Sequence, residues 1–205
     1  MEDTILEQGP GYIIAIVKEA HGIVPYGPVV RDDGTNHGWV DLRDQPNLVE
    51  TIPEVRDLPG MQAILRAANI PQSPFMTIGC EKGLFPVEGQ HPITHMVGGY
   101  IDLVFRAGDY NDPDQLVEVA RQVLSRVAPS SNVVTGYEFL VQPLKSFFGQ
   151  GGRYALMLKP QGCGENEAVA WQAFHVACMH LANALCMYIE ELSLRSADRK
   201  IESIR

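Results

Sequence analysis

The stretch Glu165–Leu194, ENEAVAWQAFHVACMHLANALCMYIEELSL, indicates how this chain of 205 residues folds. Its large apolar residues recur at alternating spacings of three and four positions, which is the period of one helix face. They are Trp171, Phe174, Cys178, Leu181, Leu185, Tyr188 and Leu192. The stretch therefore predicts one long, mostly apolar α-helix.

A second stripe of small residues lies beside this seam: Ala170, Ala173, Ala177 and Ala184. Two apolar stripes on one helix require two packing partners. A sheet can be one of them; the other is either an amphipathic helix of the same chain or the same surface of a second subunit. A helix of this length spans about 45 Å, more than a monomer of this size needs. The pattern therefore predicts a homodimer through the helix, with packing inside one chain as the alternative.

Strand and helix patterns alternate upstream of the long helix. We predict strands over Phe75–Glu81, Ile93–Ala107, Val133–Gln142 and Arg153–Lys159, and helices over Met61–Ala68 and from Asp112 to before Pro129. The order favours an α+β fold in one domain: a two-layer, largely antiparallel β-sheet packed by two helices, including the long C-terminal one. The last two strands are joined as a long hairpin.

Residues 1–60 form a predicted irregular arm with one or two strands, followed by the sheet and helices of residues 61–205. The run Ile13–Val17 is β-branched and reads as a buried strand. Glycine and proline then interrupt the chain repeatedly, which favours one hairpin turning at Asp33-Gly34 and a short helical turn after Asn47.

The formal net charge is −9, and residues 1–60 hold 11 acidic against four basic residues. An acidic chain without a basic stripe is repelled by phosphate backbones, so we expect no nucleic-acid partner. No apolar run reaches the roughly 20 residues that cross a bilayer, so we expect no membrane association. Four cysteines in a chain this long do not suggest a disulfide scaffold, and a cytoplasmic location is expected.

The predicted sheet has one apolar and one polar face. Alternation places Ile101, Leu103 and Phe105 on the core side, while charged residues of the same strands face away. If the acidic arm covers this polar face, a small-molecule pocket becomes plausible there. In such a pocket Asp102 and Glu138 are acid–base candidates, and Arg106 and Arg153 are candidates to hold an anion.

Two further residues are candidates on local grounds. Cys163 lies between two glycines before the long helix, where the positive end of the helix dipole lowers a thiol pKa and favours a nucleophile. Glu165 and Glu167 already occupy that first turn, which counts against it. His95 enters a strand near Gly98-Gly99 and is a ligand-binding candidate.

Metal binding is not expected. His91 and His95 are four positions apart, but in an extended chain they lie about 13 Å apart and cannot share one ion. Cys80 and Glu81 end a predicted strand, a position where catalytic groups often lie. No other feature of the sequence supports a catalytic role for them.

The function that these patterns favour is a small polar-molecule-binding protein or enzyme with its pocket on the polar sheet face. Its ligand would be polar or anionic, and no cofactor is indicated. The alternative is a non-catalytic homodimeric interaction or structural protein that uses its long C-terminal helix. The patterns identify neither a reaction nor a substrate.

Overall fold

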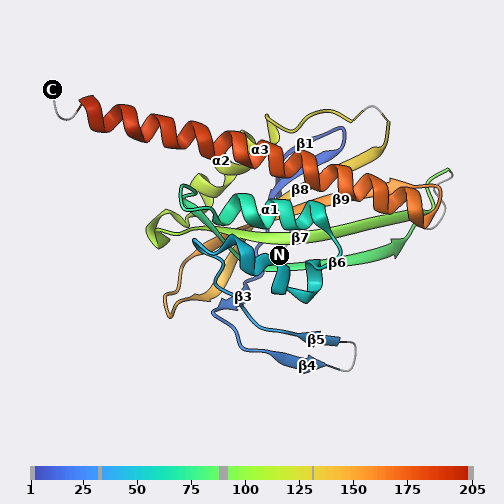
Figure 1. Ribbon diagram of the computed structural model, residues 1–205, viewed down its shortest axis with the longest axis horizontal. Helices are drawn as coiled ribbons and strands as arrows, with labels where there is room; N and C mark the ends of the chain where they lie inside the picture. The colour runs from blue at the N-terminus through green and yellow to red at the C-terminus, as the bar shows by residue number, and fades with distance from the viewer. Residues whose placement is uncertain (1–2, 32–33, 88–91, 131, 203–205) are drawn as a thin grey trace.

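The computed structural model describes residues 3–31, 34–87, 92–130 and 132–202 (Figure 1). Its strands are β1 (Thr4–Gly9), β2 (Tyr12–Ile16), β3 (His21–Val24), β4 (Val29–Arg31), β5 (Gly34–Asn36), β6 (Phe75–Pro86), β7 (His95–Phe105), β8 (Val134–Phe147) and β9 (Tyr154–Gly164). Its α-helices are α1 (Pro59–Asn69), α2 (Pro113–Leu124) and α3 (Glu167–Glu202). Short 3-10 helices lie at Pro46–Thr51, Pro53–Val55 and Gly108–Tyr110.

The main sheet confirms the predicted fold class. Its strand order is β1-β2-β8-β9-β7-β6, and β3 also pairs with β8. Only β2 and β3 run parallel to β8 among the described pairs; the other pairs of this sheet are antiparallel. The long hairpin between β8 and β9 is present, and both strands extend five residues beyond the predicted ends at Gln142 and Lys159. The sheet also takes in β1 and β2, so part of the predicted arm belongs to it.

The helices cover one face of this sheet. Figure 1 shows α3 lying diagonally across the strands, with α1 beside it. Beneath them, Ile101, Leu103, Phe139 and Leu158 are fully buried in one apolar core, as the alternation of the strands predicted. α2 begins as expected, because the Asp112 carboxylate accepts a hydrogen bond from the Gln115 amide at 3.0 Å.

Helix α3 buries its alanine stripe and the middle of its heptad seam inside the chain, while Trp171 and Leu192 near the ends of the seam are partly buried. Phe174, Cys178, Leu181 and Leu185 belong to the main core, and the four alanines of the small stripe are fully buried. The two partners that the pattern required are α1 and the sheet. A Cβ atom added at Gly60 of α1 would lie 2.7 Å from the Cβ of Cys178, so the two helices cross closely. The reason for predicting a dimer through these stripes was therefore wrong, and dimerisation itself stays an untested prediction.

The arm between β2 and α1 crosses the other face of the sheet. Its β4–β5 hairpin matches the predicted one, although Asp32 and Asp33 of the turn lie outside the described residues. After the hairpin, the Trp39 amide donates to the Tyr26 carbonyl at 3.0 Å, and the Trp39 ring packs on a second apolar cluster. That cluster comprises Val24, Met76, Ile78, Val104, Leu144, Phe147 and Ala155. The arm thus covers part of the face that was predicted to be polar.

Within the described ranges, no helix has the length and apolar character needed to cross a membrane.

Candidate functional site

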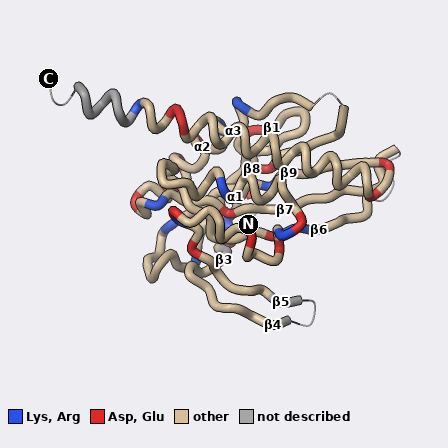
Figure 2. Tube along the Cα trace, in the orientation of Figure 1, with Lys and Arg blue, Asp and Glu red and all other residues tan. Residues whose placement is uncertain are grey.

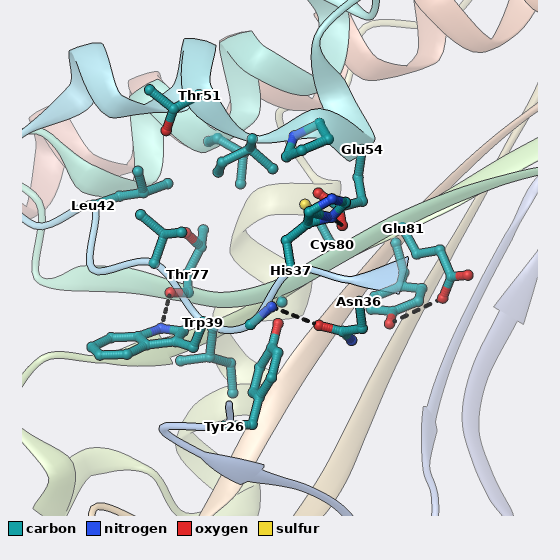
Figure 3. A pocket seen from close by; sticks show the side chains of 18 residues that line it. Tyr26, Asn36, His37, Trp39, Leu42, Thr51, Glu54, Thr77, Cys80 and Glu81 are labelled. Carbon is teal, nitrogen blue, oxygen red and sulfur yellow. Dashed lines mark hydrogen bonds and ion pairs between the residues drawn. The ribbon is translucent and has the colours of Figure 1, made fainter. Parts of the chain in front are cut away.

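The arm and the sheet enclose two adjoining cavities. The first has a volume of about 430 Å³ and lies between β6 and residues 36–54 (Figure 3). The second has a volume of about 390 Å³ and lies over β7 and β8, beneath β3 and β4. They share the lining residues Tyr26, Asn36, Ile78, Gly79 and Tyr100. Volumes of this size are typical of small-molecule sites.

Asp102 lies in the wall of the second cavity. Its Oδ1 accepts a hydrogen bond from Gln142 Nε2 at 2.9 Å. Its Oδ2 accepts none from any described side chain or backbone amide. That second oxygen points toward Gly79, because a Cβ atom added there would lie 3.2 Å from it. Burial raises the pKa of Asp102 to about 7, and the Gln142 hydrogen bond offsets only part of this shift. The carboxyl group can therefore gain or lose a proton near neutrality.

Two tyrosines stand where the cavities meet. The added Cβ atom at Gly79 would lie 3.8 Å from the Tyr26 hydroxyl and 4.0 Å from the Tyr100 ring. The Tyr100 hydroxyl donates to Glu81 Oε2 at 3.4 Å. Burial, reinforced by nearby acidic groups that include Asp102, raises the pKa of Tyr26 to about 12 and that of Tyr100 further. Both phenols are therefore protonated at neutral pH and can donate hydrogen bonds.

The first cavity gathers His37, Glu54 and Cys80, which Figure 3 shows close together. His37 Nδ1 lies 3.3 Å from Glu54 Oε1. A cysteine beside a histidine and a carboxylate suggests a nucleophile, but no hydrogen bond joins Cys80 to His37 among the described contacts. Burial, helped by nearby carboxylates, raises the pKa of the Cys80 thiol to about 12. The thiol is consequently protonated at neutral pH and a poor nucleophile.

The charged side chains that line the two cavities are mostly acidic. Glu54, Glu81 and Asp102 supply its carboxylates, and the described lining residues of both cavities include no lysine or arginine. His37 is the one basic side chain among them, and it already faces Glu54. Among the residues that the structure describes, no group of three or more His, Cys, Asp or Glu side chains is suited to a metal ion.

Glu138, the other predicted acid–base residue, lies on the same sheet face as Asp102 but outside both cavities. Its carboxylate forms an ion pair with Lys159 and accepts a hydrogen bond from Gln161 Nε2 at 2.6 Å. The register places Leu140 and Met157, not Glu138, in line with Asp102. The expected grouping of Asp102 with Glu138 is therefore not formed.

Cys163 is separated from the cavities along β9. It pairs with Val134 and Met96, six residues beyond Met157, the residue that pairs with Asp102. Six residues of strand span about 20 Å. The Asn166 side chain, which accepts from the Val169 amide at 3.0 Å, occupies the helix entry instead. The pKa expectation was also wrong, because partial burial raises the pKa of Cys163 rather than lowering it.

The predicted anion-holding arginines are engaged elsewhere. Arg106 donates to the carbonyls of Asn69, Ile70 and Phe75, and it pairs with Asp44 at 2.8 Å. It thereby joins the end of α1 to the start of β6. Arg153 pairs with Asp109 at 2.8 Å near the β8–β9 hairpin tip. Neither residue lines either cavity, so the expected anion site is not assembled there.

His95 stands at the first position of β7 and pairs with Gly164 and Pro86. Its Nδ1 lies 2.9 Å from the Thr94 hydroxyl. It too lies outside both cavities, and His91, four positions earlier, falls outside the described residues. Of the six predicted site residues, the structure therefore places Asp102 alone in the cavity walls.

Comparison of the chain with protein-family models, curated proteins and solved structures finds no match. The geometry of the described residues therefore carries the functional argument by itself. The residues that sequence reasoning missed are Tyr26, His37 and Glu54, all in the irregular arm. Their only local signal is the concentration of acidic residues in residues 1–60, since no periodicity marks which side chains turn toward the sheet.

Proposed function

We propose that the protein binds a small polar molecule in the two adjoining cavities, with Asp102 as its acid–base group. The observation that supports this most is the free Oδ2 of Asp102 in a cavity wall. This oxygen faces the cavity and has no described protein donor, so it can accept a hydrogen bond from a ligand. The cavities are large enough for such a ligand.

The position of Gly79 provides a direct test. Its missing side chain leaves space beside Asp102, Tyr26 and Tyr100, where the cavities meet. In an NMR screen of a mixed fragment library, bound fragments should shift the amide signals of Gly79, Tyr100 and Asp102. Gly79→Val should fill this junction and abolish those shifts while the protein still unfolds cooperatively.

A matched control is Gly151→Val at the β8–β9 hairpin tip, because no atom lies within 4 Å of a Cβ added there. This variant should bind fragments as the native protein does. Fragments that shift other regions only, or that bind Gly79→Val equally well, would contradict the proposed site.

A second function is favoured by the far end of α3. Figure 1 shows α3 continuing beyond the sheet toward the C-terminus, and Leu194 on this part is 67% exposed. This supports the alternative of a homodimeric interaction protein, now through the projecting end rather than the buried stripes. Sedimentation velocity at micromolar concentration tests it: Leu194→Glu should convert a dimer to monomer, and a native protein that is already monomeric would contradict the idea.

A further inference from the structure

The two cavities restrict the charge of their occupant. Their described lining contains three carboxylates, and His37 is its sole basic side chain. An anionic ligand would meet Glu54, Glu81 and Asp102 without a cationic partner. Like charges at close range in a partly desolvated site repel strongly. The anion that Arg106 and Arg153 suggested is therefore disfavoured at this site.

We infer that the cavities bind an organic ammonium ion, whose N–H groups donate to Asp102 Oδ2 and whose carbon skeleton lies between Tyr26 and Tyr100. The inference rests on the proposed function and specifies the ligand class of the same site. Asp102 is the anchor because Gln142 holds only one of its oxygens, at 2.9 Å. The other oxygen faces the space above Gly79 that both cavities share.

The other two carboxylates of the lining each have a protein partner. Glu81 accepts from the Tyr100 hydroxyl, and Glu54 faces His37. They contribute a negative field across the first cavity, whereas Asp102 offers a free acceptor. Burial raises the pKa of Asp102 to about 7, and a bound cation would restore the ionised form that burial disfavours.

The aromatic side chains suit the same ligand. Tyr26, Trp39 and Tyr100 line the cavities, and Figure 3 shows Tyr26 and Trp39 on the same side of the first one. The face of an aromatic ring carries negative potential and attracts cations, most strongly where water is excluded. An ammonium ion attached to an apolar skeleton therefore gains from both the carboxylates and the rings.

Three probes of nearly equal shape test the inference: 2-phenylethylammonium, 2-phenylethanol and 3-phenylpropanoate. NMR titration of the native protein at pH 8 should show the ammonium binding at least tenfold more tightly than the alcohol. The phenylpropanoate should bind more weakly than either. The ranking in the native protein needs no variant, so a failure of a variant to fold does not remove the test.

Asp102→Asn then locates the effect. The asparagine keeps an oxygen for Gln142 but removes the charge, so ammonium affinity should fall about tenfold or more while alcohol affinity changes little. Glu138→Gln is the matched control, because it removes a carboxylate from the same sheet face outside both cavities. It should leave the ranking of the probes unchanged.

The outcomes separate the two proposals. The alcohol or the phenylpropanoate could shift the signals of Gly79, Tyr100 and Asp102 and bind as tightly as the ammonium. That result would overturn the ammonium inference but would still support the proposed small-molecule site. If none of the three probes shifts these signals at millimolar concentration, and the fragment screen is also negative, both are overturned. Equal loss of ammonium affinity in Asp102→Asn and Glu138→Gln would also overturn the inference, since a general charge effect would explain it.

Discussion

Some charged residues of this protein stabilise the fold, whereas one carboxylate, that of Asp102, faces a cavity with an oxygen that has no described donor. Arg106 is the clearest example of the first kind. Its guanidinium group satisfies three backbone carbonyls from two elements and pairs with Asp44. Asp102, four residues earlier on β7, keeps one carboxyl oxygen without a described protein donor. The two residues should respond very differently to substitution.

Substitution of Arg106 tests its structural role. Arg106→Gln removes a charged donor from the carbonyls of Asn69, Ile70 and Phe75. The first two keep backbone donors, the amides of Asp44 and Ser73, so the free energy of unfolding should fall by about 2 kcal/mol in urea denaturation. Arg66→Gln is the control, since its pair with Glu50 is exposed and should contribute less than about 1 kcal/mol. Equal effects of the two substitutions would contradict the role assigned to Arg106.

The stability of the native protein should depend on pH through Asp102. Burial raises the folded pKa to about 7, above that of the unfolded chain, so the unfolded state loses its proton first as pH rises. The free energy of unfolding should therefore fall between about pH 4 and pH 7 and then level off, by up to about 4 kcal/mol from this group. Around it stand Tyr26, Tyr100, Cys80 and the carboxylates Glu54 and Glu81, with Gln142 as its hydrogen-bond donor.

Asp102→Asn isolates this contribution. The variant should match the native protein near pH 4 and be more stable above pH 7, as measured by urea denaturation across that range. Glu19→Gln, at an exposed position, should leave the pH profile unchanged. A native profile that Asp102→Asn does not flatten would show that the carboxyl group does not titrate as described.

At the scale of elements, the contact between α3 and β9 determines how the two layers fit. Gly162 and Gly164 lie on the core side of β9, directly under the first turns of α3. A Cβ atom at Gly162 would lie 2.5 Å from the carbonyl carbon of Ala173, and backbone atoms cannot move aside as a flexible side chain can. The alanines of α3 and the glycines of β9 together allow this close approach.

Gly162→Ala should therefore destabilise the protein by at least about 2 kcal/mol, because it forces helix and strand apart. The control is Gly151→Ala, where the added Cβ atom meets no neighbour within 4 Å. Thermal unfolding of both variants beside the native protein measures the difference. A Gly162→Ala protein as stable as the Gly151→Ala variant would contradict the close packing of α3 on β9.

At the scale of the whole molecule, a two-layer body carries an arm on its other sheet face. Acidic and basic residues lie interspersed along the body (Figure 2). The β4–β5 hairpin is a separate two-stranded sheet, and Val30 within it is 82% exposed. Such a hairpin has little apolar burial to stabilise it, unlike the central strands beneath the helices.

Hydrogen exchange should reveal this division. The described amides of residues 29–36 should exchange much faster than those of β7, β8 and β9 near Ile101, Phe139 and Leu158, which are fully buried. Mass spectrometry of peptic fragments measures both in one experiment. Saturation with a ligand of the two cavities should slow exchange of the arm more than that of the core. Equal protection of hairpin and central strands in the free protein would contradict this description.

The local patterns of the sequence determined the main elements, because helix and strand periodicities depend on which residues must be buried. The heptad seam from Trp171 to Leu192 predicted the long helix, and the alternation Ile101, Leu103, Phe105 identified the core face of β7. Asp112 predicted the start of α2, since capping is an interaction between neighbours in sequence.

Only the tertiary structure decided what these elements contact. The seam and the alanine stripe favoured a second subunit as their cover, with packing inside one chain as the alternative, and it is α1 and the sheet that pack against them. The candidate site depends on register across strands and on the path of an arm without periodicity. Register brought Gln142 to Asp102 and left Glu138 and Cys163 outside the cavities, while the arm supplied Tyr26 and His37. Such contacts join residues far apart in the chain, and no local pattern of residue types specifies them.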